Sequence, residues 1–479
     1  MKTNVRDMTS GSPVKHILIF ALPTLIGNIF QQVYNLADSM IVGRFVGSNA
    51  FAAIGATASI TFLFFALCNG LGNGGGIVVS QYYGAHDESN VKKCIINTGF
   101  IMLIVPVFFG IVSLFLAPAL LRFLDTPELL MDDAVFYTRF MCVGLTFVSL
   151  YNYMSAMLRA LGDSRTPLYF LIISTIINII LDLLFVCVLD LGIGGAAVAT
   201  IIAQAISVIS CFIHARRTNP YFRFRKEDFS ITLKMTGRIV RLGVPMSLQF
   251  ALIAVSSMAV QRIVNQYGPV VVASFTATNR IEQLIHQPFM TLGASLSTFS
   301  GQNFGAKRND RVYAGYRSGV YIMVLLSLFL ILGMQLFGRS LISLFVTDSD
   351  IIDLGAKGLR ISSLFYMALG LIYVVRGVLT GIGDAFFALF NGIVEVIGRF
   401  TIPIFMCSYL GFGSTGIWLS AGVVWFLSGI TAWFRYLGYF RLKLSKEELT
   451  PVSGSSLHIF RPFQAVLHAF RSRQRARFQ

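Results

Sequence analysis

The stretch Gln81-Tyr82-Tyr83-Gly84-Ala85 closes a long apolar segment, and the similar stretch Gln302-Asn303-Phe304-Gly305-Ala306 closes another in the second half of the chain. We call the spacing from Gln81 to Gln302 the repeat interval. Gly162-Asp163 recurs at the same interval as Gly383-Asp384. Motifs that recur in order at one long interval indicate an internal structural repeat. We therefore expect the chain to fold as two similar halves.

The composition places both halves in a membrane. Of the 479 residues, 55% are hydrophobic and 13% are charged, whereas soluble domains carry about 25% charged residues. A soluble protein cannot cover that much apolar surface, and disordered chains are poor in apolar residues. The six cysteines occur singly, without the spacing of a metal site or a disulfide framework, so we expect small buried hydrophobes.

Twelve segments are long and apolar enough to span a bilayer, which takes about 20 helical residues. They cover residues 15–42, 50–80, 93–118, 132–158, 166–190, 194–215, 240–266, 270–300, 312–338, 353–381, 385–410 and 414–438. We predict an all-α polytopic membrane protein with 12 transmembrane helices in two six-helix lobes related by the repeat. Two lobes inserted with the same polarity are typical of transporters.

The predicted organisation follows from these segments. It comprises an N-terminus of residues 1–14, an N-terminal lobe of 15–215, a basic loop of 216–239, a C-terminal lobe of 240–440 and a basic tail of 441–479. The net charge of +16 does not indicate nucleic-acid binding, because 27 of the 38 Lys and Arg residues lie in alternate connections and the termini. Cytoplasmic connections are the ones that carry such an excess. We therefore expect both termini, the loop and the tail to lie in the cytoplasm, against anionic membrane lipid.

Polar residues share one face of the first helix and of the fifth. Thr24, Asn28, Gln31, Asn35 and Asp38 follow steps of four and three, and Ser174, Asn178 and Asp182 follow two steps of four. Ionisable residues inside spans are costly and mark functional sites. Asp38 and Asp182 lie at similar depth, so they either share a proton or, with Asn178, bind Na⁺. A structural ion pair of Asp182 with Arg139 is the alternative.

The C-terminal half does not repeat this acid pair, because Val260 and Pro403 stand at the matching positions. It carries Glu282 and His286 on one helix and Glu395 and Arg399 on another, near the midplane where transporters bind substrate. A Glu395–Arg399 ion pair within one turn and a purely structural His286 are the alternatives. The residues that we name as substrate or cavity candidates are Gln31, Tyr34, Asn35, Asn152, Glu282, His286, Glu395 and Arg399.

Five motifs in this order resemble the prokaryotic MATE (multidrug and toxic compound extrusion) transporters. They are Gln31-Gln-Val-Tyr-Asn35-Leu-Ala-Asp38-Ser-Met-Ile-Val-Gly43-Arg44, Gln81-x-x-Gly84-Ala85, Arg159-Ala-Leu-Gly162-Asp163, Asn178-x-x-x-Asp182 and Gly301-Gln302-Asn303-Phe304-Gly305-Ala306. The resemblance covers about residues 15–440. It implies an efflux antiporter with two six-helix lobes and a coupling-ion site at Asp38, Asn178 and Asp182. Some members use acids in helices seven and ten instead, where this chain has Gln261 and Arg262 in helix seven and Tyr366, Tyr373 and Arg376 in helix ten.

These observations lead to one main functional hypothesis. We expect an H⁺- or Na⁺-coupled antiporter that exports cationic or aromatic compounds across the bacterial inner membrane by alternating access. We expect no enzyme activity, no cofactor other than the coupling ion, no bound metal other than Na⁺, no nucleic-acid partner and a monomer. A flippase for lipid-linked precursors is the alternative, since Arg139, Arg262, Arg280, Arg376 and Arg399 lie within spans. A receptor or channel has no need for duplicated lobes.

Overall fold

The computed structural model describes residues 4–46, 48–123 and 126–444, with side chains throughout these ranges except at 33–40, 42–44, 48–56, 58–59, 123 and 440–444. All regular structure in these ranges is helical. The α-helices are α1 Pro13–Phe45, α2 Ser48–Gly84, α3 Glu88–Phe123, α4 Glu128–Ala160, α5 Arg165–Asp182, α6 Gly192–Thr218, α7 Leu233–Asn265, α8 Pro269–Gly305, α9 Asn309–Ile342, α10 Ser349–Ser363, α11 Tyr366–Gly381, α12 Ala385–Ile404 and α13 Thr415–Leu444. Two π-helices, Leu183–Val188 and Phe405–Tyr409, follow α5 and α12.

The helices form the predicted membrane-spanning architecture. Within the described residues, ten helices are long and apolar enough to cross a bilayer, and the bent pair α10–α11 makes an eleventh span. Helix α8 supplies the twelfth predicted span by its length of 37 residues. It is not among the ten helices that are apolar enough, and Glu282 and His286 lie within it.

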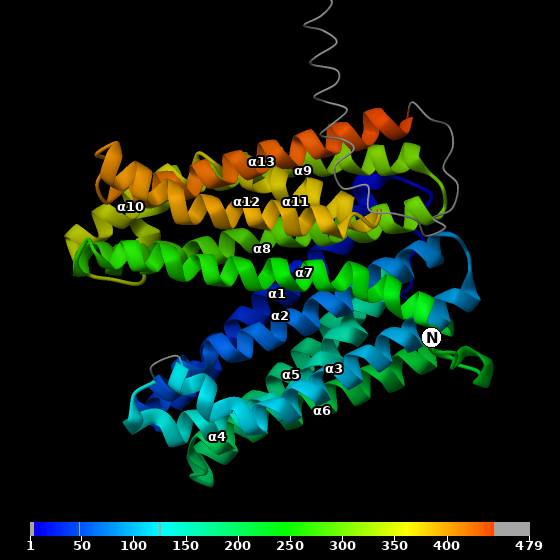
Figure 1. The fold of residues 1–479 in the computed structure, drawn as a ribbon, viewed down its shortest axis with the longest axis horizontal. Coiled ribbons are helices and arrows are strands. Elements are labelled where there is room, and N and C mark those ends of the chain that lie inside the picture. The colour runs from blue at the N-terminus through cyan, green and yellow to red at the C-terminus, as the bar shows by residue number, and fades with distance from the viewer. Residues whose placement is uncertain (1–3, 47, 124–125, 445–479) are drawn as a thin grey trace, which may run out of the picture.

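Helices α1–α6 and α7–α13 form two bundles (Figure 1). The bundles lie close together at the end where α1 begins and are further apart at the opposite end (Figure 1). We call residues 4–12, which precede α1, the strap, and this end of the molecule the strap end. The two-lobed, all-α fold predicted from the repeat is confirmed.

The first turns of α1 and α7 are exchanged between the two hydrophobic cores. Ile17 and Phe20 of α1 are buried in the core formed by α8–α13. Ile239 and Leu242 of α7 are buried in the core formed by α2–α6. Ile17 matches Ile239, and Phe20 matches Leu242, at the repeat interval to within one position. Equivalent residues of the two halves are therefore exchanged between the cores. The lobes predicted as 15–215 and 240–440 follow the order of the chain and do not include this exchange.

Backbone details recur at the same spacing. The π-helices begin at Leu183 and at Phe405, which match at the repeat interval to within one position. His86 and Lys307, which match at the repeat interval itself, have positive φ angles of 56° and 57°. Non-glycine residues adopt this conformation rarely, so its recurrence at matching turns shows that the two halves share local structure as well as topology.

One predicted span is broken. The segment predicted as 353–381 consists of α10 and α11, which meet at an angle of 50°. No proline lies at the break. The chain tightens there into i to i+3 hydrogen bonds, in which the backbone N–H of Phe365 donates to the carbonyl of Ser362 at 3.0 Å. The pair Ser362–Ser363 precedes the bend, and serine pairs are among the common causes of sharp kinks.

The expectation of six buried cysteines is wrong at one position. Cys68, Cys94, Cys142, Cys211 and Cys407 are buried, and Cys187 is exposed. Cys187 lies within the first π-helix, where one extra residue per turn rotates side chains away from the face that α-helical spacing predicts.

A glycine pair tests how tightly the C-terminal bundle packs. A Cβ atom at Gly358 of α10 would stand 2.5 Å from the buried indole of Trp418, whereas one at Gly333 of α9 would meet no atom within 4 Å. Overpacking costs about 1–3 kcal/mol, and alanine gains roughly 0.5–1 kcal/mol over glycine in a helix. We therefore expect Gly358→Ala to lower the thermal unfolding midpoint in detergent and Gly333→Ala to maintain or raise it. Equal midpoints for the two variants would contradict this packing.

Candidate functional site

A buried amide–carboxylate pair lies on α5 of the N-terminal lobe. Asp182 and Asn178 are 0% and 1% exposed. With the Asn178 amide oriented to satisfy its neighbours, its Nδ2 donates to Asp182 Oδ2 at 2.8 Å and its Oδ1 accepts from the backbone N–H of Thr200 at 3.1 Å. One turn earlier, Ser174 donates to the carbonyl of Ala203 at 3.3 Å. These contacts place the three residues on one face of α5, against α6.

The Asp182 carboxylate stands where the helix changes its winding. Asp182 is the last residue of α5, and the π-helix Leu183–Val188 begins at the next residue. Single-turn π segments concentrate at functional sites because they re-aim side chains inside an otherwise regular helix. Arg139, the partner considered from the sequence, donates through Nε to the carbonyl of Leu114 at 2.9 Å.

Helix α1 lies between the two lobes. It packs against α5 on one side and α8 on the other, and Asn28 donates through Nδ2 to Thr291 of α8 at 3.1 Å. Gln31 is half-buried. Tyr34, Asn35 and Asp38 fall within α1, but their side chains lie outside the described residues.

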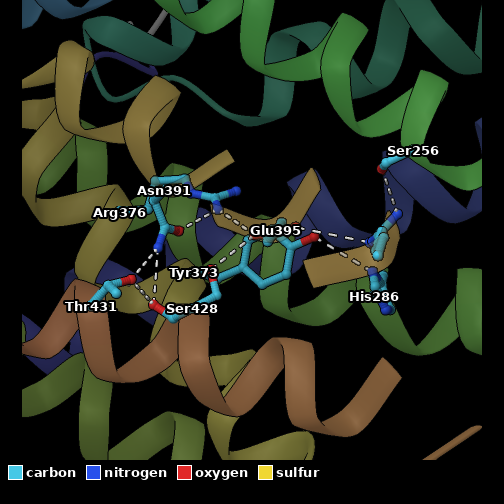
Figure 2. A network of polar contacts seen from close by, with 9 residues as sticks. Ser256, His286, Tyr373, Arg376, Asn391, Glu395, Ser428 and Thr431 are labelled. Atoms are coloured by element: carbon cyan, nitrogen blue, oxygen red, sulfur yellow. Dashed lines mark hydrogen bonds and ion pairs between the residues drawn. The ribbon is translucent and has the colours of Figure 1, made fainter. Parts of the chain in front are cut away.

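A polar network crosses the C-terminal lobe (Figure 2). Arg376 of α11 donates through Nη2 to Glu395 Oε1 at 2.7 Å and to Asn391 Oδ1 at 2.6 Å, both on α12. The Asn391 amide donates in turn to the carbonyl of Ser428 at 2.9 Å and to Thr431 Oγ1 at 3.0 Å, both on α13. The side chain of Glu395 is 7% exposed and that of Arg376 is 12% exposed. Three helices are thus joined around a buried ion pair.

The same carboxylate is approached by a second cation from its own helix. Arg399 Nη2 lies 3.8 Å from Glu395 Oε2, and Arg399 Nη1 donates to Ser257 Oγ of α7 at 3.1 Å. The predicted Glu395–Arg399 pair therefore exists, but the shorter contact is with Arg376. Two guanidinium groups around one carboxylate leave the network with an excess of one positive charge.

His286 lies beside this network (Figure 2). Its Nδ1 is 3.5 Å from Tyr373 Oη, and its ring packs edge-on against Trp425 with centroids 5.6 Å apart. His286 is thus held between α11 and α13 by aromatic and polar contacts.

Two further candidates stand apart from the network. Glu282, one turn before His286 on α8, keeps a buried Oε1 without a hydrogen-bond partner among the described residues. Asn152 donates to the carbonyl of Val148 in its own helix at 3.0 Å. The structure therefore brings Glu395, Arg399 and His286 together and does not join Glu282 or Asn152 to them.

Sequence reasoning missed the central role of Arg376. A charged arginine within a span is costly unless it has a partner inside the protein. This energetic cost is the signal that could have identified Arg376 as part of the network. The helical spacing of Glu395 and Arg399 pointed to a partner on the same helix, whereas the closer partner comes from α11. Trp425 gave no such signal, because aromatic residues are common throughout the chain.

A polytopic chain of two lobes in the same orientation, with ionisable groups buried in both, has the architecture of a membrane transporter. The chain belongs to the MatE family, whose model matches residues 23–184 and 245–403. One matched range falls in each half, so the family unit is itself the repeated unit.

Relatives extend over nearly the whole chain. The chain is 31% identical over 449 residues to a protein of Bacillus subtilis named "Probable multidrug resistance protein YpnP", covering 92% of this chain and 98% of that protein. It is 24% identical over 407 residues to the "Multidrug export protein MepA" of Staphylococcus haemolyticus, covering 84% and 88%.

Solved structures confirm the fold. The structure described as "Outward-facing conformation of a multidrug resistance MATE family transporter of the MOP superfamily" superposes with a TM-score of 0.86 at 23% identity, covering 94% of this chain and 100% of that one. A MOP superfamily transporter from Pyrococcus furiosus superposes with a TM-score of 0.83 at 23% identity, covering 93% and 99%.

The buried ion pair predicts a large effect on stability. Removing one partner of a buried pair costs about 3–5 kcal/mol, because the other charge remains in a low-dielectric site. We expect Glu395→Ala to lower the unfolding midpoint in detergent strongly, and a further Arg376→Met substitution to recover part of the loss. Asp353→Ala is the matched control. It removes the carboxylate that pairs with Arg339 where both side chains are more than half exposed, which costs at most about 1 kcal/mol. If Glu395→Ala and Asp353→Ala lowered the unfolding midpoint by similar amounts, the buried ion pair would contribute no more to stability than the exposed one.

Proposed function

We propose that this chain is an H⁺- or Na⁺-coupled antiporter that exports cationic, aromatic compounds from the bacterial cytoplasm by alternating access. The buried Asn178–Asp182 pair at the end of α5 is the observation that carries the proposal. Membership of the MatE family establishes a membrane transporter. The coupling ion, the substrate class and the direction of export are what the proposal adds.

The N-terminal pair is suited to a small cation. Asp182 is fully buried, and the Asn178 amide nitrogen donates to it while the amide oxygen accepts from the backbone N–H of Thr200. A cation that binds there is therefore held by the carboxylate and separated from water. Carboxylate and amide oxygens are hard ligands that suit Na⁺ as well as a proton-sharing pair. The buried carboxylate, with an amide group in contact with it, therefore supports an ion site at this position.

Helix α1 supplies the second carboxylate of the proposed site. Asp38 lies seven residues before the end of α1 at Phe45, and Asp182 lies six residues before the end of the π-helix at Val188. Both helices run away from the strap end, and α1 packs against α5. Because a helix rises by about 1.5 Å per residue, the two positions have similar depth, which supports a shared site.

Alternating access needs two lobes that separate at one end while they meet at the other. In this structure α2 and α7 meet in their strap-end halves, where Ser247 of α7 donates to the carbonyl of Leu67 of α2 at 2.8 Å. The excess of Lys and Arg in the connections at this end supports a cytoplasmic position for it. On this orientation the structure corresponds to the state closed toward the cytoplasm.

The substrate class follows from the charges of the two lobes and from the relatives. Glu395 already has two guanidinium partners in the C-terminal lobe, so an organic cation is attracted by the carboxylates of the N-terminal lobe instead. The two relatives compared above carry names for multidrug resistance and multidrug export. Aromatic side chains attract organic cations through their ring faces, which agrees with a flat, cationic substrate.

The flippase alternative is less well supported. It needs arginines that are available to a pyrophosphate, but Arg376 and Arg399 both pair with Glu395. Arg139 already donates to a backbone carbonyl. A pyrophosphate lipid would therefore have to displace existing partners at three of the five arginines named above.

Transport by purified protein tests the proposal. In proteoliposomes with a separately imposed proton or sodium gradient, we expect the wild-type protein to move ethidium under at least one gradient. Asp182→Asn and Asp38→Asn are each expected to reduce this transport to the rate of protein-free liposomes, because an amide cannot carry the charge that the coupling ion neutralises.

Asp353→Asn provides the matched control, since it makes the same chemical change at an exposed carboxylate. This variant should transport at the wild-type rate. Wild-type rates for Asp182→Asn under both gradients would refute coupling at this site, and transport of a pyrophosphate lipid in place of ethidium would favour the flippase.

A further inference from the structure

At the strap end, the two copies of one motif reach across to the opposite lobe through their glutamines. Gln81, near the end of α2, donates through Nε2 to the carbonyl of Gly381 at the end of α11, at 2.8 Å. Gln302, near the end of α8, donates through Nε2 to the carbonyl of Ala160 at the end of α4, at 3.0 Å. The repeat interval separates Gln81 from Gln302, and it also separates Ala160 from Gly381. One hydrogen bond is thus made twice, once from each lobe to the other.

Glycines bring the two helix ends close enough for this exchange. A Cβ atom at Gly84 would stand 1.8 Å from the carbonyl oxygen of Gln302, and a Cβ atom at Gly305 would stand 1.8 Å from the carbonyl oxygen of Gln81. Small residues permit such backbone contact between membrane helices. Because the obstructing atoms belong to the backbone, any larger side chain at either glycine must push α2 and α8 apart.

The other side of each glutamine amide is also held by the opposite half. Arg238, in the first turns of α7, donates through Nη2 to Gln81 Oε1 at 2.6 Å. The backbone N–H of Met8, in the strap before α1, donates to Gln302 Oε1 at 3.0 Å. Gln81 and Gln302 are 4% and 0% exposed. Each buried amide is therefore satisfied on both sides by groups from the other half of the chain.

The strap connects both lobes at the same place. The backbone N–H of Arg6 donates to the carbonyl of Leu161 after α4, at 3.1 Å. Two residues later, the carbonyl of Met8 accepts from Asn303 at 3.2 Å and from Arg311 at 2.9 Å, in the C-terminal lobe. Separation of the lobes at this end breaks the two hydrogen bonds from Gln81 and Gln302 to the helix-end carbonyls of the opposite lobe. It also detaches the strap from one of the two lobes that it contacts.

These contacts are suited to reversible closure. A neutral hydrogen bond gains little net free energy over the bonds that its groups make with water. When the lobes separate at this end, water reaches both amides and replaces the lost partners. The closed state is then favoured by a modest amount that depends on both glutamines together.

We propose that Gln81 and Gln302 form an inner gate, a twofold pair of positioning residues that stabilises the state in which the strap end is closed. They act on the balance between the two states of the transporter and do not contact its substrate. That the gate faces the cytoplasm rests on the proposed function. The closure itself rests on the contacts described here.

Distances between spin labels on the two lobes test the gate. One pair, at Ser89 of α3 and Arg317 of α9, reports on the strap end, and both positions are exposed. The other pair, at Leu129 and Leu344, reports on the opposite end, where these side chains are 80% and 76% exposed. Labels are placed in a Cys187→Ser background, because the other five cysteines are buried. Double electron–electron resonance is measured on the full chain in lipid nanodiscs, without substrate or gradient.

We expect Gln81→Ala and Gln302→Ala to populate a longer strap-end distance and a shorter distance at the opposite end. Because each substitution removes one of the two cross-lobe hydrogen bonds that are related by the repeat, the two variants should shift the distances in the same direction. A shift of roughly tenfold in the ratio of open to closed molecules is expected for each, and roughly a hundredfold for the double variant if the effects add.

Gln335→Ala is the matched control. Gln335 also donates through Nε2 to a helix-end carbonyl, that of Arg360 at 2.9 Å, but both residues belong to the C-terminal lobe. Its substitution should leave both distance distributions unchanged. Unchanged distributions in the double glutamine variant, or an equal change in the Gln335 variant, would overturn the proposal.

A second substitution keeps the test decisive if the glutamine variants fail to fold. Gly84→Ala retains both glutamines and inserts one methyl group between α2 and α8. A longer strap-end distance in this variant supports the gate, and an unchanged distance overturns it. Failure of the proposed function can be distinguished from failure of the gate. Loss of coupling at Asp182 changes ethidium transport under a gradient, but it leaves the spin-label distances measured without substrate or gradient unchanged.

Discussion

A carbonyl that is buried at the end of a helix needs a partner from the protein, and in this molecule two such partners come from the opposite lobe. The last residues of α4 and α11, Ala160 and Gly381, have carbonyls that their own helices do not satisfy. Glutamines from α8 and α2 donate to them. The carbonyls at these helix ends are therefore satisfied only when the two lobes are in contact. The strap end is the place where the two halves are hydrogen-bonded to each other.

The interval between motifs was enough to predict the two-lobed fold and the equivalence of Gln81 and Gln302. It did not predict that the two glutamines donate to carbonyls of the opposite lobes. A sequence repeat shows which positions of the two halves are equivalent, but it does not show whether a residue contacts its own half or the other one. The exchanged starts of α1 and α7 escaped prediction for the same reason. Ile17 and Ile239 are both isoleucines, and either core could bury them. Their identity therefore does not predict which lobe each one packs into.

Inside the lobes, spacing along one helix predicted shared faces and failed to predict partners from other helices. Ser174, Asn178 and Asp182 do share a face of α5, as their steps of four require. Glu395, in contrast, is bound more closely by Arg376 of α11 than by Arg399 one turn away. The π-helices and the break between α10 and α11 were also not predicted, because local winding depends on packing that hydrophobic spacing does not describe.

The exchange of helix starts has a consequence for how such a chain arose. Two half-length chains that traded their first helical turns would form a domain-swapped homodimer, a low-cost route to a symmetric pair. Joining the end of one copy to the start of the next, through the segment between α6 and α7, gives the arrangement seen here. The strap before α1 and the segment before α7 correspond to the two swapped arms of such a dimer.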